Sequence, residues 1–96
     1  MNKMEALVND NNFEEIKALA EKRYMTVDFE GTTYYMTQDA YADNYQNEPA
    51  VFTHAVSGET DESGNLIIYR VRWDYIEAED LEDCADWDSP VDVTRC

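Results

Sequence analysis

The chain has 96 residues, about the size of one small domain built around a single core, so we expect residues 1–96 to form one domain. Its 22 acidic residues outweigh 7 lysines and arginines, and the resulting net charge of −15 disfavours direct binding to nucleic acid or to an anionic membrane surface. Because 44% of the residues are hydrophobic and 12% aromatic, the chain is expected to fold in spite of this charge.

The sequence carries no sign of membrane insertion or export. The longest apolar run covers residues 66–69, whereas a membrane span needs roughly 20 residues. The N-terminal residues lack the apolar stretch and cleavage site of a signal peptide. Cys84 and Cys96 are too few for a disulfide framework, and we expect two reduced thiols, with a bond that ties down the C-terminal tail as the alternative. These features predict a soluble, intracellular, monomeric protein.

The first predicted element is a helix that Asn11 or Asn12 caps. Acidic residues in its first turn and basic residues near its end suit the helix dipole. A short helical turn over residues 3–8 can precede it. The apolar stripe of the main helix, at helical spacing, consists of Phe13, Ile16, Leu19 and Ala20.

At Tyr24 the pattern changes from helical to alternating, which predicts a hairpin with a short turn at residues 30–31. Residues 38–47 are polar and rich in tyrosine, and we expect a short helix there that Pro49 ends. A third strand is predicted over residues 51–57.

Residues 58–65 have the composition of a turn throughout. They match the first half of a calcium-binding EF-hand loop, but Arg70 stands where the bidentate glutamate belongs, so a hairpin turn is favoured. The strand predicted over residues 66–76 places Val71 and Trp73 on one face and Arg70 and Arg72 on the other.

Residues 77–88 are predicted as a C-terminal helix, followed by a tail. The order of elements indicates an α+β fold, with a small antiparallel sheet of three to four strands flanked by two to three helices.

The acidic residues are concentrated in two stretches without any lysine or arginine, residues 24–69 and 73–94. A helix over residues 77–88 would carry its seven carboxylates within about 18 Å, or one per roughly 2.6 Å. Duplex DNA carries one charge per about 1.7 Å, a density of the same order. This favours a polyanion that competes with nucleic acid for a basic groove. A salt-adapted or merely solubilising acidic surface is the alternative.

Signs of catalysis are weak. His54 is the only histidine, so a structural zinc site lacks ligands, and no local signature supports a nucleophilic pair of His54 with Cys84. No glycine-rich phosphate loop occurs, and we expect no enzyme, cofactor or metal. Four aromatic residues beside acids fit either ordinary packing or an exposed surface that stacks on a partner's arginines; these are Tyr35, Tyr41, Tyr45 and Trp87.

In size, acidity and order of elements the chain resembles small phage-encoded DNA mimics, in particular the anti-CRISPR proteins that block the type I-F surveillance complex. The stretches that carry the resemblance are residues 1–7, 24–30 and 77–88. The resemblance implies an inhibitor, acting in the host bacterial cytoplasm, that occupies the basic channel where target DNA enters. It would contact the lysines and arginines of the subunits that read the protospacer-adjacent motif. Antirestriction proteins and inhibitors of DNA-repair glycosylases resemble the chain on the same grounds.

We therefore expect a non-enzymatic inhibitor whose carboxylates stand in for phosphates. An acidic adaptor that binds a basic partner protein without mimicking DNA remains the alternative from another class. The residues predicted to contact the partner are Asp28, Glu30, Asp39, Asp43, Asp74, Glu77, Glu79, Asp80, Glu82, Asp83, Asp86 and Asp88.

Overall fold

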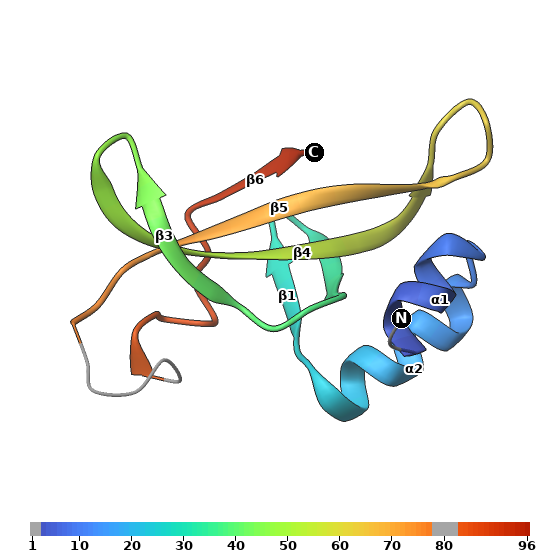
Figure 1. Cartoon of the computed structure of the whole chain (residues 1–96), viewed down its shortest axis with the longest axis horizontal. Coiled ribbons are helices and arrows are strands. Elements are labelled where there is room, and N and C mark those ends of the chain that lie inside the picture. The colour runs from blue at the N-terminus through green and yellow to red at the C-terminus, as the bar shows by residue number, and fades with distance from the viewer. Residues whose placement is uncertain (1–2, 78–82) are drawn as a thin grey trace.

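The computed structural model describes residues 3–77 and 83–96, shown in Figure 1. The fold is α+β, as predicted: within these residues, two N-terminal helices accompany a six-stranded antiparallel sheet that is strongly curled into a half-barrel. The elements are α1 (Lys3–Asn9), α2 (Phe13–Arg23), β1 (Thr26–Phe29), β2 (Thr32–Met36), β3 (Tyr41–Tyr45), β4 (Glu48–Thr60), β5 (Leu66–Asp74) and β6 (Asp92–Arg95).

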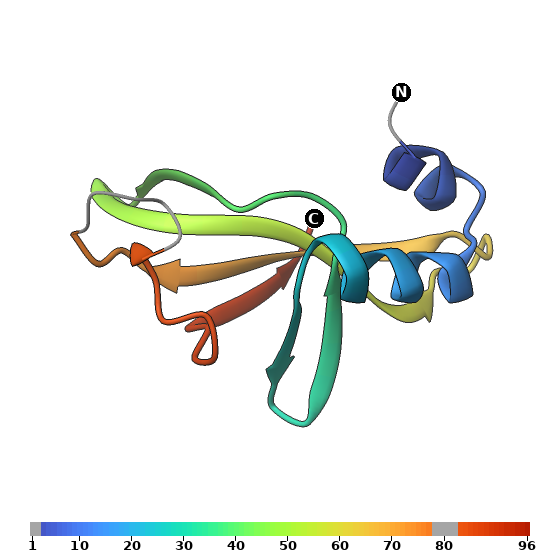
Figure 2. The same ribbon diagram turned by 90° about the horizontal axis from the view of Figure 1, so that it is seen from below.

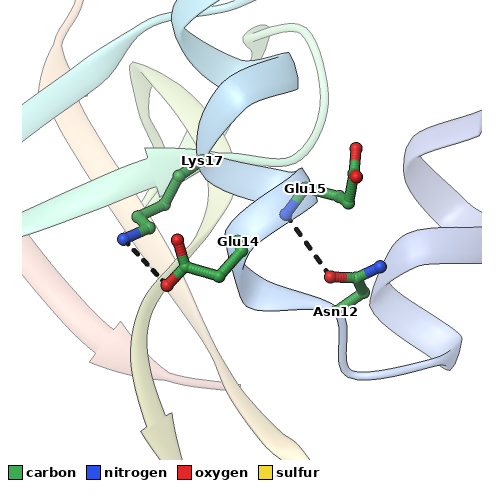
Figure 3. A network of polar contacts seen from close by, with 4 residues as sticks. All are labelled: Asn12, Glu14, Glu15 and Lys17. Atoms are coloured by element: carbon green, nitrogen blue, oxygen red, sulfur yellow. Dashed lines mark hydrogen bonds and ion pairs between the residues drawn. The ribbon is translucent and has the colours of Figure 1, made fainter.

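Helix α2 begins where the sequence predicts. The side-chain oxygen of Asn12 accepts a hydrogen bond from the backbone N–H of Glu15 at 3.4 Å, which satisfies one of the free donors of the first turn (Figure 3). One turn further, Lys17 and Glu14 form an ion pair at 3.2 Å. The short helix α1 confirms the predicted helical turn before it.

The long hairpin of β4 and β5 forms the centre of the sheet. Strand β5 pairs along one edge of β4. The other edge is shared: β2 pairs with β4 at residues 55–56 and β3 pairs with it at residues 48–52. Strand β6 adds to the free edge of β5, and β1 to that of β2. The sheet order is therefore β1-β2-β4-β5-β6, with β3 beside the first half of β4.

Each face of the sheet has its own apolar core. On one face, Val71 and Trp73 of β5 pack with Val51 and with Cys84 from the segment after β5. The opposite face is covered by the helices at the end of the sheet where β4 turns into β5, as Figure 2 shows. There the buried residues are Met4, Ile16, Ala20, Val56 and Leu66. The alternation predicted for β5 is confirmed, because Arg70 and Arg72 lie on the face away from Trp73.

Gly58 lets α2 approach the sheet closely. It lies where the β4–β5 register shifts, between Val56 and Thr60, and has a φ of +97°. A Cβ atom at this position would lie 2.6 Å from the ring of Phe13, the first residue of α2. Glycine is required here both by the backbone conformation and by the contact.

Several expectations are confirmed. The hairpin of β1 and β2 turns at Glu30 and Gly31, both with positive φ. The turn predicted over residues 58–65 is confirmed for residues 61–65, where the Asp61 carboxylate accepts hydrogen bonds from the backbone N–H groups of Ser63 and Asn65, whereas residues 58–60 belong to β4. The strand predicted over residues 51–57 is part of β4, and His54 within it is half-buried.

The sheet is larger than the three to four strands predicted. The helix expected over residues 38–47 is wrong, because residues 41–45 form β3, and the third strand extends to Glu48–Thr60. Strands β3 and β4 are joined by a two-residue turn in which Gln46 and Asn47 have φ of 51° and 68°. This conformation matches the twist of a hairpin and normally attracts glycine. Pro49 is tolerated beside the start of β4.

The C-terminal helix expected over residues 77–88 is wrong for its second half. Residue 83 lies in a 3₁₀ turn and residues 84–88 are bends, turn and irregular chain without α-helix, while residues 78–82 lie outside the described part of the chain. Cys84 and Ala85 are buried in the core of the sheet, so tertiary packing determines this segment. The predicted tail contains β6. Cys84 and Cys96 are not joined by a disulfide bond.

Candidate functional site

A row of residues across three strands places two predicted site residues on one face of the sheet. Ala50 of β4 is paired with Asp43 of β3 on one side and with Asp74 of β5 on the other. Directly opposed residues of neighbouring strands point to the same face. The two aspartates are therefore two strand spacings apart, about 9.5 Å between Cα atoms, and both are exposed.

Two more exposed carboxylates lie at the same end of the sheet. Glu48 begins β4 opposite Tyr45, next to the β3–β4 turn. Glu77 follows three residues after the end of β5. Figure 1 shows the β3–β4 hairpin and the end of β5 together, at the opposite end of the molecule from the helices.

The segment after β5 adds three further carboxylates. The backbone N–H of Ile76 donates to the carbonyl of Cys84 at 2.6 Å, and the indole N–H of Trp73 donates to the carbonyl of Trp87 at 3.3 Å. The two tryptophan rings meet edge to face at 5.0 Å. These contacts anchor the segment through its apolar residues, and its acidic residues remain exposed; these are Asp83, Asp86 and Asp88.

We call this group of exposed carboxylates the acidic end; it comprises Asp43, Glu48, Asp74, Glu77, Asp83, Asp86 and Asp88. Within residues 3–77 and 83–96, none of them lies within 4.0 Å of a basic side-chain nitrogen. The ion pairs of Lys17 with Glu14 and of Arg72 with Asp92 involve other acids. The acidic end thus presents its negative charge to solvent.

The structure separates the remaining predicted residues from the acidic end. Asp28 and Glu30 lie on the β1–β2 hairpin, which projects from the sheet apart from the β3–β4 tip (Figure 2). Asp28 accepts a hydrogen bond from the Thr33 hydroxyl at 2.7 Å. Asp39 is exposed between β2 and β3 and lines a cleft that Trp87 also borders. Residues 79, 80 and 82, predicted as contact residues Glu79, Asp80 and Glu82, lie outside the described residues.

A cluster of arginines and aromatic rings on the same face as Asp74 was not foreseen from the sequence. The Arg72 guanidinium lies 4.0 Å from the Tyr45 ring centroid, and that of Arg70 lies 4.9 Å from the Phe52 centroid. The Arg72 Nε is buried and donates no hydrogen bond within the described chain. Both arginines therefore stack on rings of this chain, and neither forms an ion pair with a carboxylate of the acidic end within the described residues. Two features of the sequence could have indicated this cluster: the arginines are two positions apart, and Tyr41 and Tyr45 are four positions apart. On a strand, each of these spacings places both residues on one face.

The four aromatic residues that lie beside acids in the sequence all contact other side chains of this chain. Tyr45 packs against arginines of its own chain, Tyr35 meets Phe13 edge to face, and Trp87 packs on Trp73. Tyr41 stacks on Phe52 and is still 37% exposed. Packing within the chain accounts for most of them.

Three groups, of which Cys84 and Tyr34 are buried and Tyr69 is half-buried, have raised pKa values. Burial raises the pKa of the Cys84 thiol, and the nearby Asp83 carboxylate adds to the effect. Burial also raises the pKa of Tyr69, which donates a hydrogen bond to Glu59 at 3.2 Å, and that of Tyr34, which feels the charge of Glu59. A thiol with a raised pKa is a poor nucleophile, since the thiolate is the reactive form.

Comparison with known protein families, with curated proteins and with solved structures finds no match for this chain. Within the described residues, no helix is long and apolar enough to cross a membrane.

Proposed function

We propose that this protein is a non-enzymatic DNA mimic that inhibits a bacterial defence complex. Its target in this proposal is the type I-F CRISPR surveillance complex, whose basic site for target DNA and the protospacer-adjacent motif it occupies. The partner surface is rich in lysine and arginine, and the protein itself binds no nucleic acid. Seven exposed carboxylates without basic partners, gathered at one end of a small rigid sheet, are the observation that carries this proposal.

The arrangement of the acidic end suits a surface that replaces phosphates. Asp43 and Asp74 are about 9.5 Å apart across β4, roughly one Debye length at 0.1 M salt. At this separation they repel each other only weakly, and each can pair with a different cation of a partner. Both sit on strands, so their spacing is fixed before binding and costs little ordering.

The negative charge of the protein contributes to both the rate and the affinity of its binding to a basic partner. A net charge of −15 steers the protein toward a basic groove and raises the association rate. Each carboxylate that contacts a lysine or arginine forms a charge-assisted hydrogen bond and makes that side chain unavailable to DNA.

The test is a gel-shift assay with purified type I-F surveillance complex and labelled target duplex. We expect the protein to abolish the shifted band near one equivalent per binding site. Parallel assays with a restriction enzyme and with a DNA-repair glycosylase test the related mimicry targets. An unchanged shift for the surveillance complex, with loss of the shift for either enzyme, would reassign the target but keep the mimicry. Unchanged DNA binding by all three would refute the proposal.

A further inference from the structure

A cleft at the acidic end combines apolar walls with carboxylates. Its volume is about 380 Å³, and it is lined by Trp73, Asp74, Ile76, Asp86, Ser89 and Val91. Ile76 is 49% exposed and Val91 is 40% exposed, so the fold leaves two large apolar side chains in water. Covering such surface with the apolar atoms of a partner is favourable.

Backbone hydrogen bonds hold the walls of this cleft in place. Ile76 is tied to Cys84 at 2.6 Å, and the N–H of Val91 donates to the carbonyl of Arg72 at 2.8 Å. The N–H of Ser89 donates to the carbonyl of Asp86 at 3.0 Å. The cleft is therefore formed before any partner arrives, which lowers the entropy cost of filling it.

The charges at the cleft define what can fill it. Asp74 and Asp86 both border it, and no basic side chain of the described residues lies within 4.0 Å of either carboxylate. Trp73 is fully buried, so the accessible walls are aliphatic and not aromatic. A side chain with a long methylene stem and a terminal cation matches both properties, because lysine buries its stem along apolar surface and keeps its ammonium group exposed.

The geometry points to this cleft as the docking site for a lysine side chain of the partner. The methylene stem lies along Ile76 and Val91, and the ammonium group pairs with the carboxylate of Asp86 at the border of the cleft. The basic nature of the partner rests on the proposed function. The cleft adds something that charge mimicry alone lacks: a part of the affinity that depends on stem length and that salt does not screen.

Two peptides of equal charge test this directly by calorimetry with the intact protein. Hexalysine has four methylenes in each side chain, and the hexamer of 2,4-diaminobutyrate has two. At mildly acidic pH the amines of both peptides are protonated while carboxylates stay ionised. We expect hexalysine to bind about fivefold more tightly, since burying each methylene is worth up to about 0.8 kcal/mol. The ratio should persist when salt weakens both affinities.

Variants of the cleft test whether its apolar walls cause the preference for hexalysine. Ile76→Ser combined with Val91→Ser should reduce the preference for hexalysine to less than twofold. The matched control Ile67→Ser, at the other end of β5, should retain it. Equal binding of the two peptides by the parent protein, or an unchanged preference in the double variant, would overturn the inference. Neither result depends on the surveillance complex, so a failure here is distinct from a failure of the proposed function.

Discussion

Asp43 and Asp74 lie directly across Ala50 from each other on one face of the sheet, although 31 positions separate them in the sequence. They belong to the two different base-free stretches of the chain. Strand β4 brings the stretches together because β3 occupies one of its edges and β5 the other. Negative charge that is divided along the sequence is therefore combined at one end of the fold.

Reversing three charges of the acidic end should abolish inhibition. The variant Asp43→Lys, Asp74→Lys, Asp86→Lys replaces three exposed carboxylates, so we expect at least a hundredfold loss of inhibitory potency, by analogy with desolvated charge pairs that each cost about 2 kcal/mol or more. The free energy of unfolding should be unchanged or higher, since like-charge repulsion falls. Potency is measured in the gel-shift assay and stability by urea denaturation.

The matched control carries the same change in net charge elsewhere. Asp10→Lys, Glu21→Lys, Glu62→Lys alters exposed residues away from the acidic end: in the α1–α2 turn, on α2 and in the β4–β5 turn. It should keep most of the potency. If both triple variants lose potency equally, net charge and not the acidic end determines inhibition.

Salt should stabilise the folded protein. Screening reduces the self-repulsion of a chain with net charge −15, and a gain of about 1 kcal/mol corresponds to about 5 °C in a domain of this size. We expect the thermal midpoint to rise by this order between low salt and about 0.5 M sodium chloride. A midpoint that is flat or falls over this range would show that repulsion does not limit stability.

Replacing Gly58 by alanine should destabilise the fold by about 2–3 kcal/mol. The new Cβ atom would clash with the Phe13 ring and would also hold a backbone φ of +97°, which disfavours side chains. Gly31→Ala is the matched control, because its φ is +82° but nothing lies within 4 Å of the new atom. It should cost about 1 kcal/mol, the strain alone. Equal losses in urea denaturation would rule out the contact with α2.

Stability should fall at alkaline pH. The pKa of Tyr69 is raised from 10.0 and that of Cys84 from 9.0. Their protonated forms are favoured by the fold, so this stability is fully present below the unfolded-state pKa values and is lost as pH rises through the folded ones. We expect tyrosinate absorbance to appear together with unfolding. Full ionisation of Tyr69 in a folded protein just above pH 10 would contradict this.

Local patterns were sufficient to predict part of the fold. Helix α2, its Asn12 cap and the alternation of β5 depend on neighbours in the sequence, and all three are confirmed. Strand β3 was missed because its turn lacks glycine and because, of its five residues, only Tyr41 and Tyr45 favour a strand. The pairing of β3 with β4 supplies the order that its own residues do not signal.

The sequence predicts which residues supply the negative charge of the candidate site, but not how these residues are arranged in space. The base-free stretches are visible in the sequence, yet the helix that was expected to display Asp83, Asp86 and Asp88 is wrong in its described half. Burial of Cys84 and the Trp73–Trp87 contact turn these acids outward instead. Long-range contacts of this kind cannot be inferred from periodicity.

Equilibrium competition tests DNA mimicry most directly. Fluorescently labelled protein is bound to the purified type I-F surveillance complex, and unlabelled target duplex is added while anisotropy is followed. Mimicry predicts complete displacement, with an apparent dissociation constant for the protein that rises in proportion to the duplex concentration. A ternary complex, in which anisotropy stays high at saturating duplex, would contradict it.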